Sequence, residues 1–262
     1  MSYPNIDPAI FKLGPFQVRW YGLMYILGFA ASYFLVRYQI RNQRLDIDKK
    51  TTQDLFLYLI MGLIAGARLG YVIFYNLPFY LDNPLRLFAL WEGGMSFHGG
   101  LVGIIVCGLV YIKKHGIDFW QCADLVAITA PVGLGLGRLG NFINAELYGR
   151  VTDVPWGMVF PSGGNLPRHP SQLYEFLLEG VLLFAILWWL KKFSFTKGTL
   201  FSLFLLLYSV FRFIAEFFRE PDPQLGAIIS FMTMGQILSL LMALGALLLL
   251  GLLGMKKKTA SS

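Results

Sequence analysis

Three arginines stand out because they lie inside, or at the end of, long apolar runs. Arg138 ends the run that begins near Trp120, while Arg68 and Arg212 lie seven and six residues inside the ends of two other runs. A cation at such depth in a membrane costs at least ~2.5 kcal/mol unless it finds partners or water. A guanidinium presents a planar fork of donors that matches phosphate or carboxylate. These positions therefore predict an anion site within the apolar part of the chain.

A polar stripe accompanies one of these arginines. Tyr208, Arg212, Glu216 and Arg219 are separated by four, four and three residues, which places them on one face of a helix. The stripe predicts a polar wall inside a helix bundle. The alternative is a ladder of ion pairs within the helix that only packs against its neighbours, and the outer arginines in general could snorkel or pair with local acids.

A second polar cluster follows the run that Arg138 ends. Within eleven positions the chain carries a cation, two amides, a carboxylate and a phenol: Arg138, Asn141, Asn144, Glu146 and Tyr148. A plain exit loop needs polarity but not this mixture of groups. We interpret the segment as part of the anion site.

Glycines are frequent in and near the same segment. Gly135, Gly137 and Gly140 match the dinucleotide-binding GxGxxG spacing, but no strand precedes them, so we discount that reading. The alternative is close approach of helices, which the GxxxG spacing of Gly62, Gly66 and Gly70 also indicates.

His98 is the histidine best placed for proton transfer. It lies between glycines in G-G-M-S-F-H-G-G-L, and its unperturbed pKa near 6.5 suits a base. Taken alone, a histidine at a membrane interface is as readily structural. His115 and His169 do not complete a metal set with it, and the cysteines, Cys107 and Cys122, form no CxxC pair. We therefore expect no metal and no cofactor.

The elements that position these residues are predicted to be membrane-spanning helices. The chain has 262 residues, of which 56% are hydrophobic and 14% charged, and its mean hydropathy is +0.59. These values exclude a soluble enzyme. Spans of about 20 apolar residues are needed to cross a bilayer. Seven stretches are candidates: 20–36, 55–75, 97–112, 120–137, 176–190, 200–218 and 228–255.

The basic residues predict how the spans are oriented. The net charge is +7, but the cations lie between apolar runs, so nucleic acid is not an expected partner. Four connecting segments hold 13 Lys and Arg residues, ten of them Lys, and this marks their side as cytoplasmic. Of the nine Lys and Arg residues outside these segments, eight are Arg. We expect one polytopic domain over 1–262, with the N-terminus outside, the C-terminus inside and outer loops near 76–96, 138–175 and 219–227.

The polar motifs resemble one known family. The run from Gly137 to Gly149, G-R-L-G-N-F-I-N-A-E-L-Y-G, is similar to the signature of prolipoprotein diacylglyceryl transferases. Further similarity runs along the whole chain, in W-Y-G-L-M-Y, G-A-R-L-G-Y, G-G-M-S-F-H-G-G, R-H-P-S-Q-L-Y-E and Y-S-V-F-R-F-I-A-E-F-F-R-E-P-D.

The resemblance implies an activity, a location and a set of roles. These seven-span enzymes of the bacterial inner membrane transfer the diacylglyceryl group of phosphatidylglycerol to the lipobox cysteine thiol of a preprolipoprotein and release glycerol 1-phosphate. It implies an active site facing the periplasm. It also implies catalytic residues, namely His98, Tyr21, Arg138, Asn141, Glu146 and Arg212, and lipid-binding residues, namely Arg138, Arg212, Arg219, Glu216, Tyr208, Arg68 and Gly149.

The main alternative is an anion or lipid transporter. Outer arginines, glycine-rich spans and a polar stripe would also suit a translocation path. Two features argue against it, since the polar groups gather at one face and the two halves of the chain show no internal repeat.

Overall fold

The protein is described by a computed structural model of residues 1–259, except 5, 14–15, 221–226 and 230–231. The described part is mainly helical. Its contacts divide the chain into two compact units: unit 1 comprises Met1–Val36 and Ala123–Ser262, and unit 2 comprises Arg37–Cys122. Unit 1 carries the signature segment, and unit 2 carries Arg68 and His98.

The elements follow one another as a series of helices with two small hairpins. In chain order they are β1 (Ala9–Leu13), β2 (Phe16–Arg19), α1 (Trp20–Gln43), α2 (Lys49–Tyr75), α3 (Leu77–Asp82), the 3₁₀ turns η1 (Pro84–Phe88) and η2 (Leu90–Glu92), α4 (Phe97–Lys114), α5 (Phe119–Ile143), α6 (Ser171–Glu175), the π-helix η3 (Phe176–Leu182), α7 (Leu183–Leu190), α8 (Thr199–Ala215), β3 (Ala227–Ile229), β4 (Met232–Thr233) and α9 (Met234–Thr259). Antiparallel pairing joins β1 to β2 and β3 to β4.

Five helical runs are long and apolar enough to cross a membrane. They are α1, α2, α5, the continuous run Ser171–Leu190 and the part of α9 from Met234 to Met255. Helix α8 is a shorter apolar helix, and the expected span at 97–112 corresponds to α4. The expectation of an all-α membrane protein is confirmed at this level, and the count of seven spans stays a prediction.

The ends of several predicted spans were wrong. Helix α5 continues to Ile143 instead of ending at Gly137, so Arg138 lies within the helix. One reason is that the Tyr3 hydroxyl donates to the carbonyl oxygens of Phe142 and Ile143, at 2.7 and 2.9 Å, and so satisfies acceptors at the helix end. Helix α8 ends at Ala215, before the predicted end at 218.

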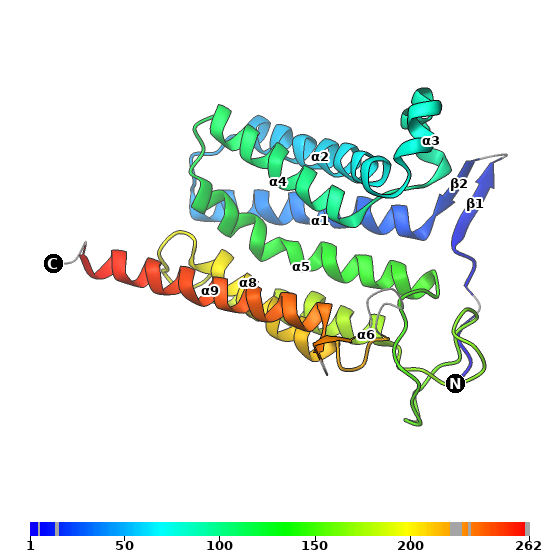
Figure 1. The fold of residues 1–262 in the computed structure, drawn as a ribbon. Coiled ribbons are helices and arrows are strands. Elements are labelled where there is room, and N and C mark those ends of the chain that lie inside the picture. The colour runs from blue at the N-terminus through cyan, green and yellow to red at the C-terminus, as the bar shows by residue number, and fades with distance from the viewer. Residues whose placement is uncertain (5, 14–15, 221–226, 230–231, 260–262) are drawn as a thin grey trace. The chain divides into compact units, whose positions relative to one another are not determined.

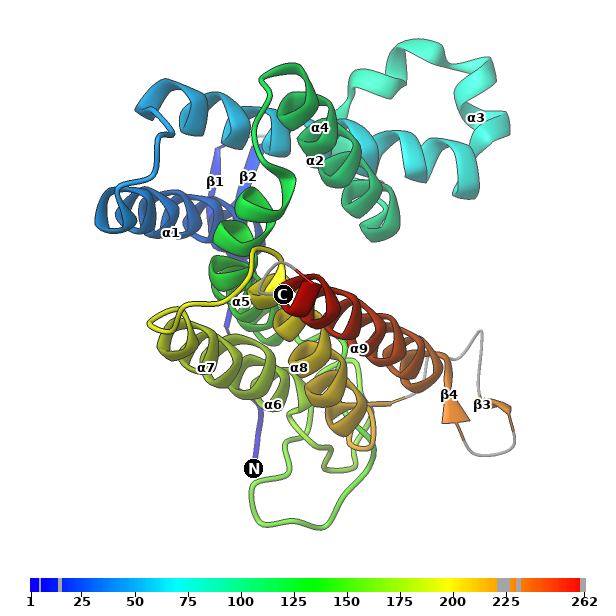
Figure 2. The same cartoon turned by 90° about the vertical axis from the view of Figure 1, so that its left-hand side faces the viewer.

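Unit 2 is built on close packing between α2 and α4, which lie side by side in both ribbon views (Figures 1 and 2). Gly62, Gly66 and Gly70 of α2 face Gly99 and Gly103 of α4. A Cβ on Gly103 would lie 1.9 Å from the carbonyl oxygen of Gly62. The predicted packing role of the α2 glycines is confirmed, because the two backbones touch directly.

Unit 1 packs α5 against the 171–190 run, with α8 and α9 side by side (Figure 2). Its apolar core contains Ile128 of α5, Leu183 and Leu187 of α7, and Leu200 of α8. A Cβ added to Gly135 of α5 would lie 3.0 Å from the Cα of Gly180. That close approach fixes the distance between α5 and the π-helix η3.

The N-terminal segment binds the loop that follows α5. The Met1 ammonium donates to the Gly157 carbonyl oxygen at 2.6 Å, and the Tyr3 amide donates to Val159 at 3.3 Å. Within unit 1, the N-terminus and this loop therefore lie together, and the last turns of α9 lie at the opposite end (Figure 1).

Candidate active site

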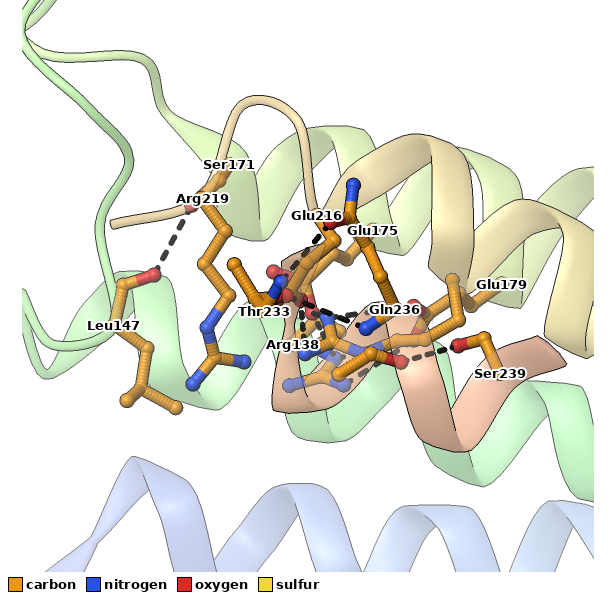
Figure 3. Close-up of polar contacts among 12 residues, drawn as sticks. Arg138, Leu147, Ser171, Glu175, Glu179, Glu216, Arg219, Thr233, Gln236 and Ser239 are labelled. Atoms are coloured by element: carbon orange, nitrogen blue, oxygen red, sulfur yellow. Dashed lines mark hydrogen bonds and ion pairs between the residues drawn. The ribbon is translucent and has the colours of Figure 1, made fainter. Parts of the chain in front are cut away.

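Two arginines and three glutamates form the most concentrated polar cluster described in unit 1 (Figure 3). Arg138 Nε lies 2.9 Å from Glu175 Oε2, and Arg138 Nη2 lies 3.2 Å from Glu179 Oε2. Arg212 Nη1 lies 3.1 Å from the same Glu175 oxygen, and Arg212 Nη2 lies 2.6 Å from Glu216 Oε2. Glu175 thus bridges the two guanidinium groups that the sequence predicted to act together.

The backbone explains why these side chains meet. Arg138 follows the tight contact between Gly135 and Gly180 by one helical turn, so it faces the 171–190 run. Glu175, the last residue of α6, and Glu179 in η3 are one turn apart, and both reach Arg138. Short π segments inside α-helices are frequent at functional sites.

Two glutamates of the cluster are buried, whereas its two arginine side chains are partly exposed and can contact a ligand. The side chains of Glu175 and Glu179 are 1% and 0% exposed, whereas those of Arg138 and Arg212 are 17% and 14% exposed. Among the described residues, neither Nη1 of Arg138 nor Nε of Arg212 has a protein acceptor. These donors are suited to bind an anion.

The signature segment forms its own hydrogen-bonded group beyond Arg138. Glu146 Oε1 accepts from Asn141 Nδ2 at 2.8 Å and from Asn144 Nδ2 at 3.2 Å. Gln172 Nε2 donates to the Glu146 carbonyl oxygen at 2.7 Å. The amides and the carboxylate that the sequence grouped together are therefore in contact, and Gln172 fixes their backbone.

The backbone of this segment is strained on both sides of Glu146. Ala145 and Leu147 have φ values of 53° and 57°, which non-glycine residues rarely adopt. Ser162 Oγ donates to the Ala145 carbonyl oxygen, and Ser171 Oγ donates to that of Leu147 (Figure 3). These bonds hold a conformation that local preference alone disfavours, as is common at functional sites.

Gly149 lies where three stretches of backbone meet. Its amide donates to the His169 carbonyl oxygen at 2.8 Å, and an isolated bridge pairs it with Arg219. A Cβ at this position would lie 2.4 Å from the carbonyl oxygen of Phe218 and 2.7 Å from that of His169. No larger residue fits without displacing this backbone.

The predicted polar stripe on α8 is correct for only part of its length. Arg212 and Glu216 form an ion pair one turn apart, as the ladder interpretation proposed, and Arg212 also reaches Glu175 on another element. Tyr208 packs against the apolar core of unit 1 and also lies close enough to Glu179 and Arg138 to interact with their charges, as the stripe predicts. Arg219 is not on the helix, because α8 ends at Ala215.

Two tyrosines at the start of α1 lie next to the signature helix. The Tyr21 ring packs on Gly140, where an added Cβ would lie 2.8 Å from Cδ2 of the ring. The Tyr21 hydroxyl lies 3.4 Å from that of Tyr25, which experiences the charges of Arg138 and Glu146. The sequence singled out Tyr21 but missed Tyr25.

Arg68 holds protein backbone. Its Nε donates to the Leu87 carbonyl oxygen at 2.9 Å, and its other nitrogens donate to carbonyls of the same loop, those of Arg86, Ala89, Gly93 and Gly94. The residue is 3% exposed. These contacts show that Arg68 secures the 86–94 loop, and its predicted contact with lipid stays a prediction.

His98 lies in the first turn of α4, in unit 2. Ser96 caps that helix by accepting from the Gly99 amide at 3.2 Å, and the Ser96 amide donates to Ala67 of α2 at 2.8 Å. The imidazole is exposed. Its predicted role as a base stays a prediction. In the described part of the chain, no group of three His, Cys, Asp or Glu residues could hold a metal.

Glu175, Glu179 and Gln172 are functional candidates that the sequence did not single out. Glu179 carried a signal that could have identified it, because an ionisable residue inside an apolar span is a functional candidate by default. Glu175 was assigned to the preceding loop because the span was begun at Phe176, whereas the helix begins at Ser171.

Comparison with known proteins agrees with the motif similarity. The family model for prolipoprotein diacylglyceryl transferase matches residues 8–252. Proteins named phosphatidylglycerol–prolipoprotein diacylglyceryl transferase are 55% identical in Desulfotalea psychrophila, covering 96% of this chain and 94% of the relative, and 54% identical in Geobacter sulfurreducens, covering 98% and 99%. A relative of the same name in Coxiella burnetii is 53% identical over 92% of each chain. The chain therefore belongs to the prolipoprotein diacylglyceryl transferase family.

Proposed function

We propose that this protein transfers the diacylglyceryl group of phosphatidylglycerol to the lipobox cysteine thiol of preprolipoproteins. The observation that carries the proposal is the Arg138 and Arg212 pair, held together by Glu175 with one donor of each guanidinium turned to no protein acceptor among the described residues. A phosphodiester is an anion that such paired guanidinium groups bind well.

The reaction is a substitution at the glycerol carbon that bears the phosphate. The substrate thiol loses its proton, its sulfur forms a thioether bond to that carbon, and the bond from carbon to the phosphate oxygen breaks. Glycerol 1-phosphate leaves with the bonding electrons. Arg138 and Arg212 stabilise the charge that grows on the departing phosphate, an effect on the order of 3 kcal/mol for a well-placed donor.

The other predicted residues support this step in distinct ways. His98 accepts the thiol proton, since an imidazole is the side chain that most often serves as a general base. Asn141 and Glu146 shape the rim of the lipid site, and Tyr21 packs on the helix that carries Arg138. Arg219 contributes a further cation beside Gly149.

We also propose the placement of the chain in the bacterial inner membrane. Helices α4 and α8 join the five longer spans to give seven, which leaves the N-terminus and the signature segment on the periplasmic side. The basic connections on the other side support this orientation. The apolar surfaces of α1, α2 and α9 are suited to face lipid.

The decisive experiment is a transfer assay with purified protein. Phosphatidylglycerol and a lipobox peptide should yield a thioether-linked diacylglyceryl peptide, seen by mass spectrometry, together with glycerol 1-phosphate. We expect Arg138→Lys to lower kcat/KM by about 100-fold, because an ammonium cannot replace the planar fork. Arg41→Lys, on an exposed cytoplasmic position, is the matched control and should leave kcat/KM unchanged.

Two outcomes would contradict parts of the proposal. Absence of product from correctly folded protein would refute the transferase activity. Near-normal turnover of His98→Gln, with Arg138→Ala inactive, would refute the role of His98 as the base and leave lipid positioning as the main contribution.

A further inference from the structure

We propose that Glu179 is an internal anion that competes with phosphate for Arg138 and thereby limits how tightly the site holds both the lipid headgroup and the glycerol phosphate product. The inference rests on the proposed function in one respect, the identity of the anion that the two arginines bind. Neither the motifs nor the family resemblance assign a role to Glu179.

The balance of charges in the cluster supports competition. In the part of the chain that the structure describes, Arg138 and Arg212 contribute two positive charges, and Glu175, Glu179 and Glu216 contribute three carboxylates. The cluster therefore carries one carboxylate more than it needs for neutrality. A phosphodiester that arrives at such a site meets arginines whose charge is already compensated, so a carboxylate must yield its place for tight binding.

Geometry identifies Glu179 as the surplus carboxylate. Its Oε2 contacts Arg138 at Nη2 and Nε, at 3.2 and 3.3 Å, whereas its Oε1 is buried, makes no hydrogen bond to a described group and lies 3.9 Å from Arg212 Nη1. A buried carboxylate oxygen without a donor is costly to keep. Glu175 and Glu216 each have one such oxygen too, so the feature that distinguishes Glu179 is its longer contacts, 3.2 and 3.3 Å against 2.9 Å for Glu175 and 2.6 Å for Glu216. The most weakly held of the three carboxylates is the readiest to exchange its place for another anion.

The other two glutamates have positions that a structural partner would have. Glu175 bridges both arginines with one oxygen, at 2.9 and 3.1 Å. Glu216 pairs with Arg212 and accepts from the Thr233 hydroxyl at 2.9 Å, which links the residue after α8 to β4, just before α9. Removing any one of the three carboxylates leaves two cations and two carboxylates, but removal of Glu175 or Glu216 also takes away a shorter positioning contact than the one that Glu179 makes.

This difference gives neighbouring variants opposite expected effects. Glu179→Gln should lower the KM for phosphatidylglycerol about tenfold and strengthen inhibition by glycerol 1-phosphate by a similar factor, since one charged hydrogen bond no longer competes. The kcat should fall, because the product leaves more slowly. Glu175→Gln should instead raise KM and lower kcat, because the arginines lose their common partner.

Direct binding provides a readout that does not need the reaction. Calorimetric titration of detergent-solubilised protein with glycerol 1-phosphate should show tighter binding to Glu179→Gln than to the unchanged protein. Glu220→Gln, which removes a half-exposed partner of Arg168, is the control and should leave the affinity unchanged. Glu179→Asp keeps the charge but draws it back from Arg138, so it should also tighten the binding of glycerol 1-phosphate, by less than Glu179→Gln does. This variant tests the competition if Glu179→Gln does not fold.

The results separate this inference from the proposed function. If the unchanged protein carries out transfer but Glu179→Gln binds glycerol 1-phosphate no more tightly, competition by Glu179 is refuted and the proposed function stands. If KM rises in both the Glu175 and Glu179 variants, both carboxylates only position the arginines. If no transfer occurs yet Glu179→Gln binds glycerol 1-phosphate more tightly, the transferase proposal fails and competition for phosphate stands.

Discussion

At the scale of single residues, the signature segment has backbone contacts and backbone angles that few residue types can adopt. Gly149 touches the backbone of both His169 and Phe218, and Glu146 is held between two residues with left-handed backbone. The chemistry-bearing side chains are thus presented by a loop whose own conformation is unfavourable. Hydrogen bonds from Gln172, Ser171 and Ser162 offset that cost.

Gly149→Ala should reduce activity more than it reduces folding. The added methyl would lie 2.4 Å from the Phe218 carbonyl oxygen, so the 149–219 bridge must open by a few tenths of an ångström or more. Overpacking of this kind typically costs about 1–3 kcal/mol. We expect transfer activity to fall at least about tenfold while the purified protein still folds, as measured by the assay and by thermal unfolding. Unchanged activity would show that the close contact is not needed.

His169 gives the loop that follows α5 a pH-dependent stability. Burial lowers the pKa of this imidazole below its usual value, and its Nδ1 lies 3.1 Å from the Tyr174 hydroxyl. Because the unfolded chain then binds a proton more readily, the contribution of His169 to stability is complete above about pH 6.5 and is lost as the pH falls through the folded pKa.

The measurement is the melting temperature of the protein and of His169→Gln between pH 8 and pH 5. We expect the unchanged protein to lose more stability than the variant over this interval. Parallel curves for the two proteins would show that His169 is not responsible.

At the scale of elements, two close backbone contacts place the functional groups. Gly135 and Gly180 bring α5 against η3, which sets Arg138 beside Glu179. The glycines of α2 and α4 set the start of the helix that carries His98.

Helix α8 is positioned by a carboxylate from α5 that caps its N-terminus. Asp124 accepts from the amides of Gly198 and Phe201, both at 2.7 Å, and so satisfies the N-terminus of the helix that carries Arg212.

Gly103→Ala should disrupt unit 2. A Cβ there would lie 1.9 Å from the Gly62 carbonyl oxygen, and backbone on both helices must separate to admit it. We expect a loss of at least about 1–3 kcal/mol, seen as a lower melting temperature and faster proteolysis of unit 2. Gly245→Ala in α9, where nothing lies within 4 Å of an added Cβ, is the control and should be neutral or slightly stabilising. Equal melting temperatures for the two variants would contradict this account.

At the scale of the whole molecule, the distribution of charge predicts how the chain crosses the membrane. Thirteen Lys and Arg residues gather in four connections, and Lys predominates there, whereas arginine predominates elsewhere. Within unit 1 the N-terminus lies beside the loop after α5, and the end of α9 lies far from it (Figure 1). Both observations favour opposite sides for the two ends of the chain.

Reporter fusions test this topology. A fluorescent protein that matures only in the cytoplasm should fluoresce when fused after Ser262, and alkaline phosphatase inserted in the loop near Asp153 should be active because it reaches the periplasm. Active alkaline phosphatase at the C-terminus would contradict the predicted orientation.

The sequence by itself determined the class of the protein, its motifs and the identity of the key cations. Apolar runs and deep arginines are local properties, because each depends on residue type and on the cost of burying a charge. The family resemblance, since confirmed by relatives at more than 50% identity, also depends only on the order of residues.

Only the tertiary structure decided which partner each cation has. Arg68 and Arg138 look alike in sequence, yet one guanidinium donates to loop carbonyls and the other pairs with glutamates of a distant helical run. The choice depends on which backbones approach closely, here at Gly135 and Gly180, and such contacts join residues far apart in the chain. The surplus carboxylate of Glu179 follows from that packing, because the charge balance of a site is a property of the side chains that the fold assembles.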